Sequence, residues 1–483
     1  MDASSDLQYT GKLYIAGELR DSSTAERFDV IDPATEESLA RVSNATQADA
    51  RAAVDAAAAA LPAWSSLAPR GRAEILRRAY ELLSARREAF ARLITRENGK
   101  ALSDARAEVA YAAEFFRWYS EEAVRNIGQV SRSPSSGARI LVQHKPAGVA
   151  VLITPWNFPA AMGTRKIAPA LAAGCTVIVK PASETPLTML ALAPVLEEAG
   201  VPPGVVNILP SRRSEAVVGT MLADPRVRVV SFTGSTEVGR RLLSAGAQFV
   251  LNPRMELGGN APFIVFEDAN LDAAVSGAMI AKMRNMGEAC TAANRFYVHE
   301  AVHDAFVQRL AREMSALKVG NGLDEGVAVG PLVNADTRDK VENLVEDARQ
   351  RGARVLTGGR RIQGRGYFYE PTVLANVPDG ALCLTEEIFG PVAPIQKFRT
   401  EEEVIARANA TQYGLVVYLY TADLARGLRV SEKLEFGMVG LNRGIVSDPA
   451  APFGGVKQSG LGREGAHEGL MEFLETQYIA VEW

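Results

Sequence analysis

The sequence predicts an α/β protein built around a doubly wound parallel sheet, followed by a second α/β pattern. From Gly148 onward, short apolar runs alternate with segments of helical spacing, as in repeated strand–helix–strand units. The first run, residues 149–153, is apolar at every position, as a strand buried on both faces should be. A second alternation of this kind begins near residue 295. Because the chain has 483 residues, it is too long for one hydrophobic core, and two or three domains are expected.

The N-terminal part is predicted to be mainly helical. Two short strands, which could pair as a hairpin, are expected over residues 13–17 and 27–31. Apolar residues at helical spacing predict helices over residues 46–61, 69–98 and 104–126. Thr46 is a plausible N-cap of the first of these helices. A polar break over residues 131–136 precedes a strand expected over residues 139–143.

The remaining elements follow two α/β patterns, of which the first is expected to form the parallel sheet. In the first pattern, strands are expected over residues 149–153, 176–179, 205–209, 227–232 and 262–266, and helices over 168–173, 186–199, 236–245 and 271–286. In the second, strands are expected over 295–298, 354–356 and 415–420, and helices over 301–317, 335–351, 401–410 and 424–434. The apolar strand expected over residues 478–481 looks exposed and needs a partner, which predicts an oligomer.

The composition excludes several classes of protein. Hydrophobic residues make up 47% and charged residues 23%, which is ordinary for a soluble globular protein. A net charge of −4 gives no basic footprint for nucleic acid. No apolar run reaches membrane-spanning length, and residues 1–10 lack the apolar core of a signal peptide. The 3 cysteines and 4 histidines are scattered and form no metal-ligand or disulfide pattern, and so few cysteines fit a reducing, cytoplasmic location.

One stretch, residues 284–291, presents a single cysteine just after a glycine-containing turn and a predicted helix. A thiol at the end of a rigid element can be aimed at a substrate, so Cys290 is a candidate nucleophile. The alternative is a buried structural cysteine, which is the commoner role of a free thiol.

Three loops that follow predicted strands lie where α/β sheets bind their ligands. Asn157, in a loop stiffened by two prolines, could donate to a developing oxyanion, and Lys180 could bind ribose hydroxyls or phosphate. Ser235 follows Gly234 at a helix N-terminus, where free backbone N–H groups suit a pyrophosphate, although the usual glycine fingerprint is absent. Glu256, ahead of two glycines, could be a general base.

Two later motifs complete the set. Glu387 and Phe389 would lie on one side of an extended chain, where they could contact a sugar and a ring together. The glycine-rich loop over residues 451–460 is expected to be a structural crossing. Each of the ligand motifs also has a structural alternative: an amide satisfying a turn, a solvated lysine, a helix cap, an ion-paired glutamate or an edge strand.

In this order, the motifs resemble the aldehyde dehydrogenase superfamily over about residues 13–478. The resemblance implies a Rossmann-type cofactor domain, an α/β catalytic domain and a small β oligomerisation element. It implies a cofactor domain of residues 1–127 and 146–257, to which 441–468 return, a catalytic domain of 258–440, and an oligomerisation element of 128–145 and 469–483. A homodimer or homotetramer is expected.

The resemblance also implies roles for individual residues. Cys290 would be the nucleophile, Glu256 the general base, and Asn157 with the Cys290 backbone N–H the oxyanion hole. The implied cofactor-binding residues are Thr154, Pro155, Trp156, Lys180, Ser183, Gly234, Ser235, Glu387 and Phe389. Because Ser183 stands where NAD-preferring members often carry glutamate, NADP is expected, and NAD remains compatible.

Within the superfamily, the sequence most resembles the succinate-semialdehyde dehydrogenases. Arg165, Arg284 and Ser447 match the positions that bind the distal carboxylate of the substrate in that group. The expected reaction is the oxidation of succinate semialdehyde to succinate through a cysteine thiohemiacetal and thioester. The alternatives are another aldehyde such as glutarate semialdehyde, or a non-catalytic structural protein on the same fold. Three residues depart from the usual pattern, namely Met283, Glu288 and Arg443, and Glu288 could perturb the pKa of Cys290.

Overall fold

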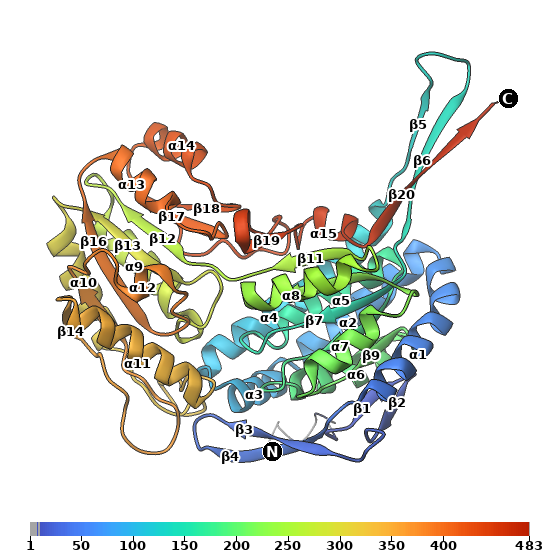
Figure 1. Ribbon diagram of the computed structural model, residues 1–483, viewed down its shortest axis with the longest axis horizontal. Helices are drawn as coiled ribbons and strands as arrows, with labels where there is room; N and C mark the ends of the chain where they lie inside the picture. The colour runs from blue at the N-terminus through green and yellow to red at the C-terminus, as the bar shows by residue number, and fades with distance from the viewer. Residues whose placement is uncertain (1–6, 8–9, 483) are drawn as a thin grey trace.

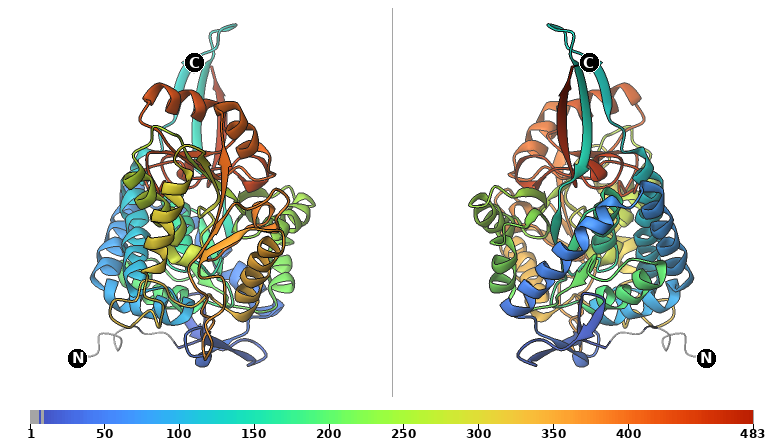
Figure 2. Two further views of the ribbon diagram at one scale, coloured as in Figure 1. Left: turned by 90° about the vertical axis from the view of Figure 1, so that its left-hand side faces the viewer. Right: turned by 90° about the vertical axis from the view of Figure 1, so that its right-hand side faces the viewer.

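The computed structural model describes residue 7 and residues 10–482, so both ends of the predicted domain division, and most of the polar stretch over residues 1–10, lie outside the described residues. Two large sheets with helices packed on them form the body of the molecule, and a three-stranded sheet projects from it as an arm (Figure 1, Figure 2). None of the described helices is both long and apolar enough to cross a membrane.

The first sheet has eight strands and a parallel centre. In spatial order these are β19 (Gly460–Leu461), β11 (Asn252–Glu256), β10 (Val227–Thr233), β7 (Val149–Ile153), β8 (Thr176–Lys180), β9 (Val206–Ile208), β1 (Leu13–Ile15) and β2 (Glu18–Arg20). From β7 the chain continues to β8 and β9 on one side, and later to β10 and β11 on the other. The strand order therefore reverses between β7 and β10, and ligands bind at such a reversal in doubly wound sheets.

Helices pack around this sheet (Figure 1). They are α1 (Gln47–Ser66), α2 (Pro69–Ala85), α3 (Arg87–Asn98), α4 (Leu102–Glu122), α5 (Ala161–Ala173), α6 (Leu187–Ala199), α7 (Ser214–Leu222) and α8 (Thr236–Ala247), with the 3-10 turn η2 (Ala123–Arg125) after α4. Thr46 caps α1 as predicted, because its hydroxyl accepts from the N–H of Asp49 and the Asp49 carboxylate accepts from the N–H of Thr46. The single helix predicted over residues 69–98 is two helices, since the backbone at Arg86 (ψ 14°) leaves the helical region.

The second sheet has seven strands, and all except β14 run parallel. In spatial order these are β14 (Arg354–Thr357), β15 (Thr372–Ala375), β16 (Val392–Phe398), β13 (Ala293–His299), β12 (Ala261–Val265), β17 (Val416–Tyr420) and β18 (Met438–Leu441). Its helices are α9 (Leu271–Met283), α10 (His303–Ser315), α11 (Ala335–Gln350), α12 (Leu382–Thr385), α13 (Glu401–Asn409) and α14 (Leu424–Lys433). The sequence analysis missed β15, β16 and β18, since two of these apolar runs are short and β16 contains Pro394.

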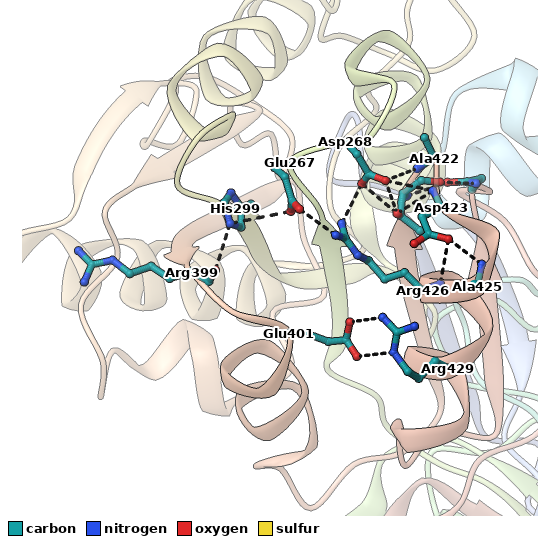
Figure 3. Close-up of polar contacts among 12 residues, drawn as sticks. Glu267, Asp268, His299, Arg399, Glu401, Ala422, Asp423, Ala425, Arg426 and Arg429 are labelled. Carbon is teal, nitrogen blue, oxygen red and sulfur yellow. Dashed lines mark hydrogen bonds and ion pairs between the residues drawn. The ribbon is translucent and has the colours of Figure 1, made fainter.

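A carboxylate just beyond the end of β12 ties this sheet to a helix (Figure 3). Asp268 accepts hydrogen bonds from the Thr421 hydroxyl at 2.9 Å and from the Asp423 N–H at 3.0 Å, and it pairs with Arg426 at 3.1 Å. Burial raises the pKa of Asp268, but the hydrogen bonds and the Arg426 charge outweigh it, so the pKa is lowered overall. These contacts hold the end of β17 and the start of α14 against β12 (Figure 3).

The arm consists of three antiparallel strands, β20 (Leu474–Val481), β6 (Arg139–Pro146) and β5 (Gln129–Arg132), and the short helix α15 (Glu468–Met471) leads into it. The C-terminal strand therefore has a partner within the chain, β6, along one of its edges. Its outer part remains exposed, with Tyr478 at 60%. In both views of Figure 2 the tip of the arm extends beyond the body. The polar break predicted over residues 131–136 is wrong at its start, because β5 extends to Arg132.

The predicted N-terminal hairpin is also wrong. The strand at residues 13–15 pairs with β2 and β9, whereas β3 (Arg27–Asp32) pairs with β4 (Glu37–Ser43). The chain therefore makes two separate hairpins here. Both unpredicted partners carry charged residues, and this hides their strand character in the sequence.

Candidate active site

A cavity of about 250 Å³ lies at the carboxyl ends of β7 and β10, beside the reversal of strand order. Of the residues singled out in the sequence, those lining it are Pro155, Trp156, Asn157, Arg165, Gly234, Ser235, Arg284, Cys290, Glu387, Phe389 and Ser447. The other lining residues are Tyr111, Phe158, Met162, Thr233, Leu257, Gly258, Ala289, Thr291, Thr337, Lys340 and Phe453. The fold thus gathers eleven of the fifteen predicted site residues, and it leaves Thr154, Lys180, Ser183 and Glu256 outside this lining.

The cysteine follows a turn with left-handed backbone. The helix predicted over residues 271–286 ends at Met283, and the 3-10 turn η3 (Arg284–Gly287) follows. Asn285 and Met286 have φ of 51° and 56°, which costs conformational energy for residues with a Cβ and is typical of functional turns. Gly287 has φ 80°, and a Cβ there would lie 2.2 Å from the carbonyl oxygen of Gly390.

Side-chain amides hold this turn in place. Asn285 Nδ2 donates to the carbonyl oxygens of Glu288 and Asn157, at 2.9 Å each. Asn157 Nδ2 donates to the same Glu288 carbonyl at 3.0 Å, and the buried Lys100 ammonium donates to the Asn157 carbonyl at 2.6 Å. Because a primary amide has two N–H groups, the second N–H of Asn157 remains for a ligand in the cavity. The amide is therefore fixed in orientation before any ligand arrives.

The Cys290 thiol is a neutral group in this environment. Burial raises the pKa of Cys290 to about 12, although the side chain keeps some exposure to the cavity. The charges of Arg165 and Arg284 act to lower this pKa, and those of Glu387 and Glu256 act to raise it. A charge brought in with a ligand is therefore needed to favour the thiolate.

Glu288, one of the three departures, is held by burial and a backbone hydrogen bond. Its carboxyl group is fully buried, and Oε1 accepts a hydrogen bond from the N–H of Val333 at 3.1 Å. Burial raises the pKa of Glu288 well above its usual range and so disfavours a charge there, while the Val333 hydrogen bond and the Lys100 charge act to lower it. The other two departures lie outside the cavity lining, Met283 being buried and Arg443 exposed.

Glu256 ends β11 beside Thr233 of β10. Both of its carboxyl oxygens are buried and lack a hydrogen-bond partner among the described residues. Burial, and after it the negative charge of Glu464, raises the pKa of Glu256 well above its usual range, while Arg165 acts to lower it. Its Oε1 lies 2.9 Å from where a Cβ on Gly454 would stand, so the carboxyl group faces that glycine. An unpaired carboxyl group with a raised pKa suits proton transfer near neutral pH.

Two groups at the strand ends fit a dinucleotide. Lys180, the last residue of β8, is 5% exposed, and its ammonium has no hydrogen-bond or ion-pair partner in the part of the chain that the structure describes. Burial lowers the pKa of Lys180 to about 8, and a buried cation without a partner indicates a polar ligand. Ser235 is the N-cap of α8, where its hydroxyl accepts from the N–H of Val238 at 3.3 Å, so other N–H groups of the first turn stay open to phosphate.

The opposite wall of the cavity also fits a cofactor. Glu387 Oε1 accepts from the N–H of Gly259 at 3.1 Å, and burial raises the pKa of Glu387 to about 7. Phe389 has φ 55°, and its ring meets that of Trp156 edge-on, with the centroids 5.3 Å apart. A carboxyl group and an aromatic ring therefore border the same space, an arrangement that fits the ribose and the nicotinamide ring of a dinucleotide.

Two predicted cofactor residues lie elsewhere. Ser183 lines a separate cavity of about 260 Å³ that Glu184 and Arg212 also line, and its hydroxyl donates to the Glu184 carboxylate at 3.2 Å. Thr154, which directly follows β7, contacts the end of β8 through its backbone, since its N–H donates to the carbonyl oxygen of Lys180 at 3.2 Å. The structure therefore separates Ser183 from the space in which Cys290 lies.

The two predicted arginines have different surroundings. Arg165 is 2% exposed, forms an ion pair with Glu464, and lies over the Phe453 ring at 3.8 Å. Arg284 donates to the Thr291 hydroxyl at 3.2 Å, and no carboxylate of the described chain lies within ion-pair distance of it. Among the described residues, Arg284 and Lys340 therefore bring positive charges without a paired carboxylate to the cavity, whereas the charge of Arg165 is offset by Glu464.

Several lining residues escaped the sequence analysis. Phe453 belongs to the glycine-rich loop that was expected to be a structural crossing, and its place beside Arg165 makes that reading incomplete. Lys340, on α11, donates to the carbonyl oxygen of Glu387 at 2.6 Å. No local pattern could have found Lys340, because a charged residue on an amphipathic helix usually faces solvent.

The chain belongs to the aldehyde dehydrogenase family, because the model of that family matches residues 19–479. A succinate-semialdehyde dehydrogenase of Paenarthrobacter nicotinovorans is 58% identical over 443 residues, which cover 92% of this chain and 98% of that relative. A glutarate-semialdehyde dehydrogenase of Pseudomonas aeruginosa is 48% identical over 468 residues, 97% of each chain. The crystal structure of an Escherichia coli NADP-dependent enzyme has a TM-score of 0.97 and 47% identity, and the match covers 99% of both chains. The predicted fold and enzyme class are confirmed.

Proposed function

We propose that this chain oxidises succinate semialdehyde to succinate, with NADP as the expected cofactor and NAD as a compatible one. The observation that carries the proposal is a single cavity in which Cys290 and Asn157 share the lining with an unbalanced Arg284 and with Ser447. A guanidinium and a hydroxyl suit a small carboxylate. The substrates in the names of the two relatives, both carboxylated aldehydes, support the same choice.

In the first half of the reaction, the Cys290 thiol releases its proton to solvent water, and the sulfur then adds to the aldehyde carbon while the carbonyl π electrons move onto the oxygen. The free N–H of Asn157 and the backbone N–H of Cys290 stabilise the oxyanion of the resulting thiohemiacetal. When bound, the oxidised nicotinamide brings positive charge toward the thiol and accepts the hydride as the thiohemiacetal becomes a thioester.

In the second half, Glu256 takes a proton from water, and the oxygen attacks the thioester carbonyl carbon. Collapse of the tetrahedral intermediate breaks the carbon–sulfur bond, releasing succinate and the Cys290 thiolate. The Glu256 carboxyl group must be ionised for this step and must turn from Gly454 toward the cavity. Its unpaired oxygens favour such a movement, because no hydrogen bond to another described residue has to break.

The cofactor would lie along the strand ends. We assign Lys180 to the adenosine ribose, Ser235 with Gly234 to the pyrophosphate, and the loop of Thr154, Pro155 and Trp156 to the adjoining wall. Glu387 and Phe389 would contact the nicotinamide ribose and ring. Ser183 itself carries no charge to repel a 2′-phosphate, and of its neighbours in the same small cavity Arg212 would attract one and Glu184 would repel it.

The domain division remains a proposal with support from the sheets. Residues 146–257 supply the parallel centre of the first sheet, β19 returns to it from within 441–468, and 258–440 supply nearly all of the second sheet. We assign the arm to oligomerisation, as a homodimer or homotetramer, because its outer strands leave backbone groups open for pairing. A cytoplasmic location remains a prediction from the cysteine content.

The test is steady-state kinetics on the purified chain with a panel of aldehydes and both cofactors. The panel contains succinate semialdehyde, glutarate semialdehyde and isocaproaldehyde, the uncharged isostere in which an isopropyl group replaces the carboxylate. Succinate semialdehyde should have the highest kcat/KM, with glutarate semialdehyde next. A highest value for glutarate semialdehyde would favour the alternative enzyme, and no cofactor reduction with any aldehyde would favour a structural protein.

A further inference from the structure

Tyr111, on α4, brings a neutral polar group to the cavity that the two arginines line. Its hydroxyl oxygen is buried and has no hydrogen-bond partner in residue 7 or residues 10–482. Its ring is fixed by an edge-on contact with Phe115, whose centroid lies 4.9 Å away. A buried hydroxyl that lines a cavity without a partner indicates that a ligand or a water completes its hydrogen bonding.

The hydroxyl lies within electrostatic reach of both guanidiniums. Burial raises the pKa of Tyr111, while the charges of Arg165 and Arg284 act to lower it. Because the burial effect prevails, the hydroxyl stays protonated at neutral pH and can donate a hydrogen bond.

The pairing of Arg165 leaves a need for such a donor. The Glu464 carboxylate pairs with Nε of Arg165 and offsets its charge, so Arg284 is the arginine of the cavity without a described carboxylate within ion-pair distance. A carboxylate has two oxygens and about four sites that accept hydrogen bonds, more than one guanidinium and the Ser447 hydroxyl fill.

We propose that the Tyr111 hydroxyl donates a hydrogen bond to the distal carboxylate of the substrate and thereby contributes to the selection of carboxylated aldehydes. The inference rests on the proposed function. Tyr111 fits this role because a tyrosine hydroxyl binds an anion without adding a second full charge, so the pocket can favour a carboxylate while leaving the nearby Glu256 and Glu464 undisturbed.

The test is the Tyr111→Phe variant, which removes one oxygen and keeps the ring. The matched control is Tyr119→Phe, because Tyr119 lies on the same helix, has a buried hydroxyl and does not line the cavity. Tyr111→Phe should lower kcat/KM for succinate semialdehyde about tenfold, mainly through KM, since a hydrogen bond to a charged group is lost. The kcat/KM of this variant for isocaproaldehyde should stay within about twofold of the wild-type value. The inhibition constant of succinate should rise by the same factor.

Three outcomes would overturn the proposal. If Tyr111→Phe changes kcat/KM for neither aldehyde, the hydroxyl does not bind the substrate. If it lowers kcat/KM equally for both aldehydes, or if Tyr119→Phe has the same effect, the hydroxyls of α4 act only through packing. A wild-type chain that does not prefer succinate semialdehyde to isocaproaldehyde would overturn the proposed function itself, whereas a preference that Tyr111→Phe retains would overturn the role of Tyr111 alone.

Discussion

The two ends of the active-site cavity balance their charges in opposite ways. Near the reacting carbon, Cys290 and Glu256 are buried without an ion-pair partner, and burial raises the pKa of both. At the far end, Arg284 keeps its charge, and no carboxylate of the described residues neutralises it. In the proposed mechanism, burial disfavours charge on the two reacting groups, and the anchor has no paired carboxylate. An anionic substrate would be attracted to the anchor, which would orient its aldehyde toward the thiol.

Arg165 belongs to both ends. It lines the cavity, but its ion pair with Glu464 and its influence on the pKa of Glu256 connect it to the reacting groups. The comparison therefore predicts two classes of variants. Changes at the reacting end should lower kcat/KM for every aldehyde, and changes at the anchor should lower it mainly for carboxylated ones.

The largest effect is expected from Cys290→Ala. Both succinate semialdehyde and isocaproaldehyde require the same nucleophile, so kcat should fall about 10⁴-fold or more with each. The assay is cofactor reduction under saturating substrate. Cys175→Ala is the control, because this buried thiol lies outside the cavity, and that variant should keep its activity. Appreciable turnover by Cys290→Ala would remove the thiol from the reacting end.

The next effect is expected from Glu464→Gln, which tests the link between Arg165 and Glu256. The side chains of Arg165, Lys166 and Glu464 are only 2%, 1% and 10% exposed, so removing the carboxylate leaves two buried cations without their partner. Unfolding in urea at neutral pH should show a loss of about 3–5 kcal/mol, as for other broken buried ion pairs. A loss below about 1 kcal/mol would contradict the burial of this network.

The pH dependence of this variant has a defined sign. Burial raises the pKa of Glu464, but the charges of Arg165 and Lys166 outweigh it and lower the pKa overall. Its stabilising contribution is therefore complete above about pH 4 and lost as the pH falls through the folded-state pKa. The stability difference between wild type and variant should shrink in acid. The same change removes a negative charge near Glu256, so the acidic limb of kcat should move to lower pH for both aldehydes.

The smallest effect is expected from Ser183→Glu. Ser183 lines a separate small cavity and lies outside both ends of the active-site cavity. A carboxylate there would repel a 2′-phosphate, so the ratio of kcat/KM for NADP to that for NAD should fall about tenfold, while the preference among aldehydes stays unchanged. Ser183→Ala is the control for loss of the hydroxyl. An unchanged cofactor ratio would show that this position does not face the 2′-phosphate.

The sequence predicted the strand ends of the site well, because parallel strands buried on both faces give clear apolar runs. Asn157 and Ser235 follow such runs, and both line the cavity. The contrast between Arg165 and Arg284 could not be predicted, since it depends on Glu464, which reaches Arg165 only after the chain has folded. Tyr111 gave no signal because one aromatic residue among several on an amphipathic helix is normally read as part of the core.

The separation of the two ends is tested most directly by Arg284→Met, assayed with succinate semialdehyde and with isocaproaldehyde. Arg443→Met is the control, because that exposed arginine does not line the cavity. Loss of a charge-assisted hydrogen bond should lower kcat/KM for succinate semialdehyde about 10- to 100-fold, whereas kcat/KM for isocaproaldehyde should fall much less, only through the weaker effect of the Arg284 charge on the pKa of Cys290. An equal loss with both aldehydes, or no loss with succinate semialdehyde, would contradict the account.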